Sequence, residues 1–229
     1  MSWSKQLLNF QTKEPMDFID KKLADYAEKH SSTESTLLAA LNRDTYANVL
    51  APRMLSGHLQ GRILSLFSKI KQPKAILEIG TYTGYAALCL AEGLAPAGVL
   101  HTIDINEELE TRILQFFGDS PYTEQLHFHI GNALDIIPTL DANFDLVFID
   151  ADKDNYSAYY NLLIDRLPQG AIIIADNVLW SGKVVNQGQL AKDKDTKALD
   201  MFNKEVNDDL RVENILLPVR DGLMVARKL

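Results

Sequence analysis

The feature that most constrains this chain is an apolar run that ends abruptly in acids. Residues 144–149, Phe-Asp-Leu-Val-Phe-Ile, are followed directly by Asp150, Asp152, Lys153 and Asp154. A short, largely apolar run is typical of a strand that is buried on both faces of a parallel sheet. Ligands in such folds bind outside the carboxyl ends of the strands. The acids are therefore expected at a binding site.

A second apolar run, at residues 171–175, ends in Asp176 and Asn177. If the two strands are neighbours, Asp150, Asp176 and Asn177 present three hard oxygen ligands at one point. Carboxylate and amide oxygens are ligands that small divalent cations prefer. The sequence therefore predicts the beginning of a divalent-cation site at this edge of the sheet.

The chain from Lys74 onward alternates short apolar runs with helical segments. The first five expected strands are residues 75–79, 99–104, 125–130, 144–150 and 170–176. Strands separated by helices imply right-handed crossovers and a parallel sheet. A helix is expected at 193–208, followed by strands at 212–218 and 223–226. The turn between these two strands is so short that it predicts an antiparallel pair.

Residues 1–73 are expected to form a helical extension of an α/β core at 74–229, the two making a single domain. One helix is expected to start at residues 15–19, where Pro15 suits a first turn. Another is expected at 33–41. A longer helix with one apolar face is predicted from Leu55, Leu59, Ile63, Leu66 and Ile70, which recur at spacings of three and four.

Composition narrows the classes of function. A formal net charge of −8 gives no footprint for non-specific binding to a polyanion, a local basic pocket aside, so a small-molecule partner is the better default. Cys89 is the one cysteine of the chain, which fits a reducing compartment. No apolar run approaches the roughly 20 residues of a membrane span, and no secretory signal is recognisable. We expect a cytoplasmic protein without membrane association.

A glycine-spaced turn follows the first expected strand of the core. Residues 78–85, Glu-Ile-Gly-Thr-Tyr-Thr-Gly-Tyr, lead from that strand into a helix, so the backbone can approach a ligand near a helix N-terminus. The motif is not the dinucleotide fingerprint, because Tyr82 occupies the place of the second glycine. Asp104, at the end of the second strand, can accept hydrogen bonds from both hydroxyls of a ribose. These residues predict a site for an adenosine without a pyrophosphate.

Five motifs in a fixed order point to a known family. They are residues 54–57, Met-Leu-Ser-Gly; 78–85; 149–156, Ile-Asp-Ala-Asp-Lys-Asp-Asn-Tyr; 175–182, Ala-Asp-Asn-Val-Leu-Trp-Ser-Gly; and 217–223, Leu-Pro-Val-Arg-Asp-Gly-Leu. Together they resemble the cation-dependent O-methyltransferases related to caffeoyl-coenzyme A and catechol O-methyltransferase. The resemblance implies a class I S-adenosylmethionine-dependent methyltransferase with a doubly wound, Rossmann-like α/β sheet of seven strands, the last antiparallel.

The resemblance also implies roles for individual residues. It implies that Asp150, Asp176 and Asn177 bind the metal, magnesium above all, with calcium, manganese or zinc as alternatives. Lys153 matches the family's general base. The implied S-adenosylmethionine contacts are Met54, Ser56, Glu78, Gly80, Tyr82, Tyr85, Asp104, Ala133, Asp150 and Asp152. The implied substrate is a small ortho-dihydroxy aromatic compound, whose two hydroxyls chelate the cation and whose deprotonated oxygen the cation favours.

Two hypotheses from other classes stay open. One is a tRNA hydroxyuridine O-methyltransferase on the same scaffold, against which the acidic composition argues. The other is a non-catalytic nucleotide-binding protein, which the intact set of Asp150, Lys153, Asp176 and Asn177 disfavours. The N-terminal segment is expected to contribute to the substrate mouth and to a homodimer contact.

Several single residues have more than one interpretation. Lys153 is either catalytic or a solvated surface lysine, and Trp180 either walls the substrate pocket or covers the sheet edge. Ala86 stands where many relatives have a serine that touches the cofactor, so one hydrogen bond is expected to be absent or supplied by backbone. Arg220 stands where smaller residues are common and is expected to be exposed to solvent.

Overall fold

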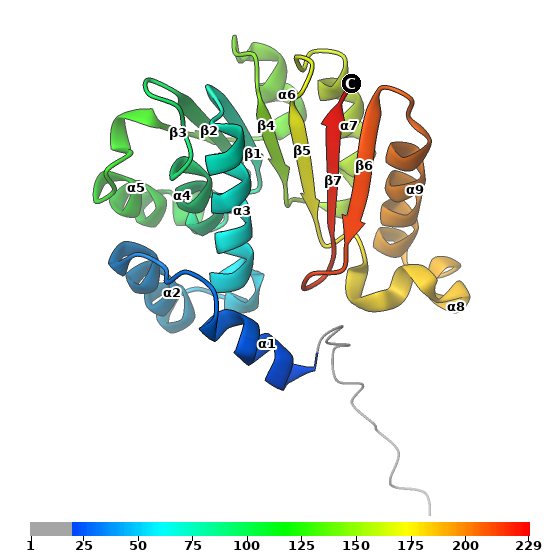
Figure 1. The fold of residues 1–229 in the computed structure, drawn as a ribbon, viewed down its shortest axis with the longest axis horizontal. Coiled ribbons are helices and arrows are strands. Elements are labelled where there is room, and N and C mark those ends of the chain that lie inside the picture. Colours follow the sequence, from blue (N-terminus) through cyan, green and yellow to red (C-terminus); the bar gives the residue numbers. More distant parts are fainter. Residues whose placement is uncertain (1–19) are drawn as a thin grey trace, which may run out of the picture.

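A seven-stranded mixed sheet forms the centre of the protein, for which the computed structural model describes residues 20–229 (Figure 1). The strands are β1 (Ala75–Ile79), β2 (Val99–Asp104), β3 (Leu126–Ile130), β4 (Leu146–Ile149), β5 (Ile172–Asp176), β6 (Val212–Leu217) and β7 (Leu223–Lys228). Their order is β3-β2-β1-β4-β5-β7-β6, and β7 runs antiparallel to both of its neighbours. The predicted fold class, a doubly wound sheet with an antiparallel last strand, is confirmed.

The chain reverses its winding direction between β1 and β4. From β1 it builds outward through β2 to β3, then returns to place β4 on the other side of β1. Parallel sheets of this kind bind ligands at such a switch point, outside the carboxyl ends of the strands. In Figure 1 the carboxyl ends of the parallel strands point toward the lower part of the view, where α1, α2 and α8 lie.

Helices cover both faces of the sheet. One face packs against α6 (Ala133–Ile136), α7 (Tyr156–Ile164) and α9 (Lys194–Asp208); the other packs against α2 (Thr36–Asn48), α3 (Gly57–Lys71), α4 (Tyr85–Ala91) and α5 (Glu110–Gly118). Two further helices are α1 (Lys21–Lys29) and α8 (Gln187–Leu190). Within residues 20–229, no helix combines the length and apolar character needed to cross a membrane.

Short 3₁₀ helices occur between these elements. They are η1 (Pro52–Met54), η2 (Glu107–Leu109), η3 (Thr123–Gln125), η4 (Ile137–Thr139), η5 (Lys153–Asn155) and η6 (Trp180–Val185). The helix start expected at residues 15–19 lies outside the described residues. The helix expected at 33–41 is α2, which begins three residues later, after its N-cap Ser35, and extends further.

Strand β4 explains why its sequence is apolar throughout. Leu146 and Phe148 point into the core on the α4 side, whereas Val147 and Ile149 point into the core on the α7 side. All four residues are fully buried. Burial on both faces removes the alternation of a half-exposed strand, so polarity returns only where the strand ends.

The helix predicted from apolar spacing is α3, but it buries a different face from the predicted one. Its buried residues are Gln60, Gly61, Leu64, Ser65 and Ser68. Leu66 and Ile70 are 59% and 73% exposed. A Cβ at Gly61 would lie 2.7 Å from the Tyr85 ring and 2.8 Å from Cys89 Sγ. The close approach of α3 to α4 selects small residues at the contact, so the prediction of the buried face was wrong.

Candidate active site

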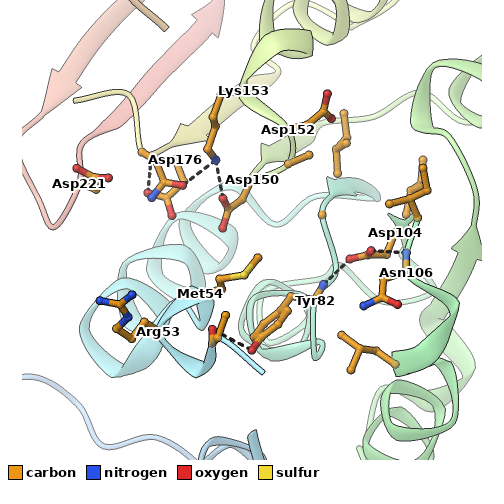
Figure 2. A pocket seen from close by; sticks show the side chains of 18 of the residues that line it. Arg53, Met54, Tyr82, Asp104, Asn106, Asp150, Asp152, Lys153, Asp176 and Asp221 are labelled. Atoms are coloured by element: carbon orange, nitrogen blue, oxygen red, sulfur yellow. Dashed lines mark hydrogen bonds and ion pairs between the residues drawn. The ribbon is translucent and has the colours of Figure 1, made fainter. Parts of the chain in front are cut away.

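A cavity of about 1670 Å³ opens at the carboxyl ends of β1, β2, β4 and β5 (Figure 2). Ten of the residues assigned to the site from the sequence line it: Met54, Gly80, Tyr82, Asp104, Ala133, Asp150, Asp152, Lys153, Asp176 and Asn177. Ser56 and Tyr85 line a small adjoining cavity. Glu78 is fully buried and lines neither cavity. The fold therefore gathers residues that are far apart in the sequence around one hollow.

The turn after β1 is fitted closely against the end of β4. Gly80 has φ +98°, and a Cβ at this position would lie 1.9 Å from the main-chain oxygen of Asp150. Only glycine combines this conformation with this approach. The backbone N–H of Tyr82 donates to Asp104 Oδ2 at 2.7 Å, and that of Asn106 donates to Asp104 Oδ1 at 2.9 Å. These two donors fix the Asp104 carboxylate and leave it further acceptor positions for a ligand.

Lys153 lies at the centre of the polar cluster shown in Figure 2. Its Nζ donates to Asp150 Oδ1 at 3.1 Å, to Asn177 Oδ1 at 2.7 Å and to Tyr156 Oη at 2.6 Å. Three bonds use all three protons of an ammonium group. The Tyr156 hydroxyl is itself buried and donates to the main-chain oxygen of Asp176 at 3.1 Å. Lys153 is therefore held in the site and is not a freely solvated surface lysine.

Asp176 is the most enclosed acid of the cluster, with 3% of its surface exposed. Its Oδ2 accepts a hydrogen bond from Gln60 Nε2 at 2.7 Å, and its Oδ1 accepts one from the backbone N–H of Asn177 at 2.7 Å. Burial, followed by the negative charge of Asp150, raises the pKa of the Asp176 carboxyl above its ordinary value. Lys153 and Arg220 act in the opposite direction and lower the pKa of the Asp176 carboxyl.

The donor set suits a hard divalent cation. Asp150 Oδ1 and Asn177 Oδ1 lie close to one point, because both accept from the same Lys153 Nζ, and Asp176 precedes Asn177 in the chain. Two carboxylates and an amide offer oxygen atoms alone, as magnesium and calcium require. Among residues 20–229, no three His, Cys, Asp or Glu side chains are grouped so that they can hold a metal ion. The expected ligand set of Asp150, Asp176 and Asn177 contains only two such side chains, because Asn177 is an amide. Metal binding by this set stays a prediction.

The adjoining region offers partners for a nucleoside. Ala133 begins α6 and is almost fully buried, and Asn132 caps that helix by accepting from the N–H of Leu134 at 3.0 Å. Asp152 Oδ1 accepts from Tyr159 Oη at 2.6 Å. Behind them, Glu78 Oε1 is buried without a hydrogen-bond partner among the described residues. Burial raises the pKa of Glu78 well above its ordinary value.

The turn after β1 also holds the N-terminal helices. Tyr82 Oη donates to the main-chain oxygen of Leu50 at 3.1 Å. Thr45 Oγ1 on α2 donates to Thr83 Oγ1 at 3.2 Å. Tyr85 Oη donates to Glu34 Oε2 at 2.6 Å, ahead of α2. The turn predicted to bind the cofactor is thus fastened to the segment that walls the cavity.

Several cavity residues were not identified from the sequence. Arg53, Asn106, Tyr159 and Asp221 line the cavity alongside the expected residues. Asp221 belongs to the motif at residues 217–223 and was therefore within reach of sequence reasoning. Arg53 directly precedes the motif at residues 54–57, Asn106 lies two residues after Asp104, and Tyr159 lies three residues after the motif at 149–156, with no distinguishing pattern.

The structure shows where Trp180 and Arg220 lie, two residues for which the sequence allowed more than one position. Trp180 lines the cavity, which answers the question left open about its position. Arg220 is exposed overall, as expected, yet its guanidinium is engaged: it donates to the main-chain oxygens of Leu55 and Ser56 and to Gln60 Oε1.

Residues 28–229 match the sequence model of the O-methyltransferase family. The chain belongs to this family. A curated O-methyltransferase of the same kind, caffeoyl-CoA O-methyltransferase 1 of Arabidopsis thaliana, is 33% identical over 180 residues, covering 74% of this chain and 70% of the relative. The caffeoyl-CoA O-methyltransferase of Mesembryanthemum crystallinum is 35% identical over 180 residues, covering 74% of this chain and 71% of the relative. The resemblance read from the motifs is confirmed.

Solved structures of O-methyltransferases and other methyltransferases share the fold. An SAH-bound methyltransferase of Podospora anserina superposes with a TM-score of 0.83 at 27% identity, covering 98% of this chain and 99% of the other. The O-methyltransferase of Bacillus cereus, in complex with SAH, gives a TM-score of 0.82 at 26% identity, covering 91% and 97%. This O-methyltransferase family member is therefore an enzyme of the methyltransferase class, which removes the non-catalytic alternative.

Proposed function

We propose that this enzyme transfers the methyl group of S-adenosylmethionine to one hydroxyl of a small ortho-dihydroxy aromatic compound and that a divalent cation serves the reaction. The observation that carries the proposal is the meeting, in one cavity, of the Gly80 turn and Asp104 with the Asp150, Lys153 and Asn177 cluster. The Gly80 turn and Asp104 suit a nucleoside. The cluster of Asp150, Lys153 and Asn177 suits a substrate with a chelating pair of oxygens.

The cofactor side of the proposal rests on backbone fit. The glycine at position 80 keeps the β1 turn free of side chain where the methionine end would lie, and Asp104 is oriented by two backbone donors toward ribose hydroxyls. S-adenosylmethionine supplies the methyl group on a positively charged sulfur. The two structures solved with SAH support this placement, because they share the fold and are themselves methyltransferases.

The cation side of the proposal rests on the oxygen donors. Asp150, Asp176 and Asn177 would hold the ion and leave about three of six octahedral positions for substrate oxygens and water. When bound, the ion favours the deprotonated form of a substrate hydroxyl and orients it. Magnesium is the expected ion, with calcium, manganese or zinc as alternatives.

Lys153 is proposed to take the proton from the substrate hydroxyl. Two of its three acceptors, Asp150 Oδ1 and Asn177 Oδ1, are oxygens assigned to the cation. With the ion bound, these oxygens would no longer be free to accept from Lys153, and a divalent charge beside the nitrogen would favour the neutral amine that a base requires. The transfer forms an oxygen–carbon bond and breaks the sulfur–carbon bond. The electron pair stays on sulfur and the proton passes to Lys153.

A direct test is methyl transfer from labelled S-adenosylmethionine to a caffeic-type catechol, with magnesium and again with chelator, beside a bulk tRNA acceptor. Catechol turnover that chelator abolishes is the expected result. Label incorporated into tRNA and not into catechol would move the substrate to the hydroxyuridine alternative. Catechol turnover unaffected by chelator would refute the role of the divalent cation in the reaction. The expected homodimer, the single-domain division at residue 73 and the cytoplasmic location stay predictions.

The variant Asp150→Asn separates metal chemistry from cofactor binding. We expect turnover to fall by about 10²-fold or more, since one of two anionic ligands is lost. S-adenosylmethionine affinity is expected to fall far less, because Asp150 is only one of its ten implied contacts. Asp154→Asn is the matched control, because Asp154 lies in the same loop but is exposed and pairs with Lys194. Loss of cofactor affinity alone, with turnover per bound cofactor intact, would contradict the assigned role.

A further inference from the structure

Gln60 links the N-terminal helices to the predicted metal cluster. It lies on α3 and is fully buried, although glutamine is usually exposed. Its Nε2 donates to Asp176 Oδ2 at 2.7 Å, and its Oε1 accepts from Arg220 Nη1 at 3.0 Å. Both polar ends of the amide are therefore satisfied inside the protein, each by a charged group.

The chemistry of the partners fixes the orientation of this amide. A guanidinium group can only donate hydrogen bonds, so the Gln60 oxygen must face Arg220. The NH₂ group is then left for Asp176, whose carboxylate can only accept. The reverse orientation would set two donors against each other and two acceptors against each other. Arg220 thus determines which atom Gln60 presents to the carboxylate.

Arg220 is anchored at the same time to the start of α3. It donates to the main-chain oxygens of Ser56 and Leu55, the latter at 3.3 Å, from the turn between β6 and β7. Arg220 and Gln60 are 160 residues apart in sequence. The guanidinium therefore ties the first turn of α3, the Gln60 side chain and the β6–β7 turn into one unit.

Asp176 is held in one rotamer by two donors. The Gln60 amide engages Oδ2, and the backbone N–H of Asn177 engages Oδ1 at 2.7 Å. The carboxylate cannot rotate without breaking one of these bonds. Its remaining acceptor positions are thereby set in direction before any ligand arrives.

We propose that Gln60 and Arg220 are positioning residues that hold the Asp176 carboxylate in the orientation required for a divalent cation. The inference rests on the proposed role of Asp176 as a ligand. Gln60 acts on the proposed metal ligand Asp176, and Arg220, which also lines the cavity, acts on Gln60. Partners that orient metal ligands in this way are worth about 10- to 100-fold in metal affinity.

The test is Mn²⁺ binding to the full chain, measured from the electron paramagnetic resonance signal of the free ion, for the wild type and for Gln60→Met. We expect affinity to fall by about 10- to 100-fold in the variant, which keeps the side-chain length but loses both hydrogen bonds. S-adenosylmethionine affinity, measured by calorimetry, is expected to stay within about twofold. Methyl transfer should recover in part at saturating Mn²⁺.

Gln125→Met is the matched control. Gln125 Nε2 donates to the main-chain oxygen of Gly98 at 2.9 Å, at the amino end of β3 and away from the cavity. This variant also loses a glutamine hydrogen bond, so it reports the effect of destabilisation alone, and its Mn²⁺ affinity is expected to match the wild type.

Arg220→Met gives an independent reading should Gln60→Met fold poorly. It leaves Gln60 in place but removes the group that orients it, so a smaller loss of Mn²⁺ affinity is expected. Arg227→Met, which removes an exposed arginine paired with Glu213 at 2.7 Å, is its control.

The outcomes separate the two proposals. Mn²⁺ binding by the wild type that neither Gln60→Met nor Arg220→Met weakens would overturn the positioning role and leave the proposed function standing. No Mn²⁺ binding by the wild type would overturn the cation itself and the positioning role with it. An equal loss of Mn²⁺ affinity in Gln60→Met and Gln125→Met would show that Gln60 acts on stability alone, and would overturn the positioning role.

Discussion

The close approach of Gly80 to the end of β4 makes a quantitative prediction. An alanine Cβ there would lie 1.9 Å from Asp150 O and 2.7 Å from Asp150 C, both main-chain atoms, and φ at this position is +98°. Left-handed backbone costs about 1–3 kcal/mol for a residue with a Cβ. Overpacking against a fixed backbone adds about 1–3 kcal/mol. We expect Gly80→Ala to lower the free energy of unfolding by about 2–6 kcal/mol.

Two other glycines separate these contributions. Gly57 has φ +73° with open space around its missing Cβ, so Gly57→Ala should show the conformational cost alone, about 1–2 kcal/mol. Gly118, the last residue of α5, also has open space and no positive φ, so Gly118→Ala should be neutral or stabilise by up to about 1 kcal/mol.

The assay is urea unfolding followed by circular dichroism, with midpoints and slopes for the wild type and the three variants. The expected order of stability is Gly118→Ala, wild type, Gly57→Ala and then Gly80→Ala. A Gly80→Ala variant no less stable than Gly57→Ala would refute the reasoning, because the clash with Asp150 would then carry no energy. Cofactor affinity is expected to fall in Gly80→Ala alone, since Gly80 lines the cavity whereas Gly57 and Gly118 do not.

Two further predictions concern charge. Lys153→Met should lower kcat by about 10²- to 10⁴-fold while leaving Mn²⁺ affinity unchanged or tighter, since a competing positive charge is removed; weaker Mn²⁺ binding would contradict this. Burial, followed by the charges of His127 and His129, lowers the pKa of His101 to about 4, below the value of about 6.5 in the unfolded chain. The unfolded chain therefore binds the extra proton first, and the free energy of unfolding should fall as pH drops from about 6.5 toward 4, by on the order of 1 kcal/mol once solvent screening is allowed for. Urea midpoints across this range should vary less in His101→Gln; an unchanged pH dependence would rule His101 out as the cause.

The polar residues Asp150, Asp152, Lys153, Asp176 and Asn177, identified from the sequence, share one property: they lie at or just after the ends of buried strands. Polarity returns abruptly at Asp150 and at Asp176 because β4 and β5 are enclosed until their last residue. The pairing of these two strands then follows from the alternation of strands and helices. Where a site is built at strand ends, the apolar pattern that predicts the fold also points to the site.

Gln60 shows what such a pattern cannot predict. A single glutamine in a helix is typical of a solvated position, and its partners Asp176 and Arg220 lie 116 and 160 residues away in the sequence. The face of α3 was also assigned wrongly, because apolar spacing was weighed and small-residue packing at Gly61 was not. The burial of Gln60 and the packing at Gly61 both depend on tertiary contacts, which the local sequence pattern does not reveal.

The hydrogen bonds that join Tyr82, Thr83 and Tyr85 to the segment before β1 bear on protein engineering. A chimera that exchanges the segment before β1 for that of a relative, in order to change the substrate, would cut through all of them. The graft would have to bring its own acceptor at position 34, its own hydroxyl at position 45 and a matching main chain near position 50. A more conservative exchange would leave these anchor points in place and replace only the exposed stretch around Met54, which lines the cavity.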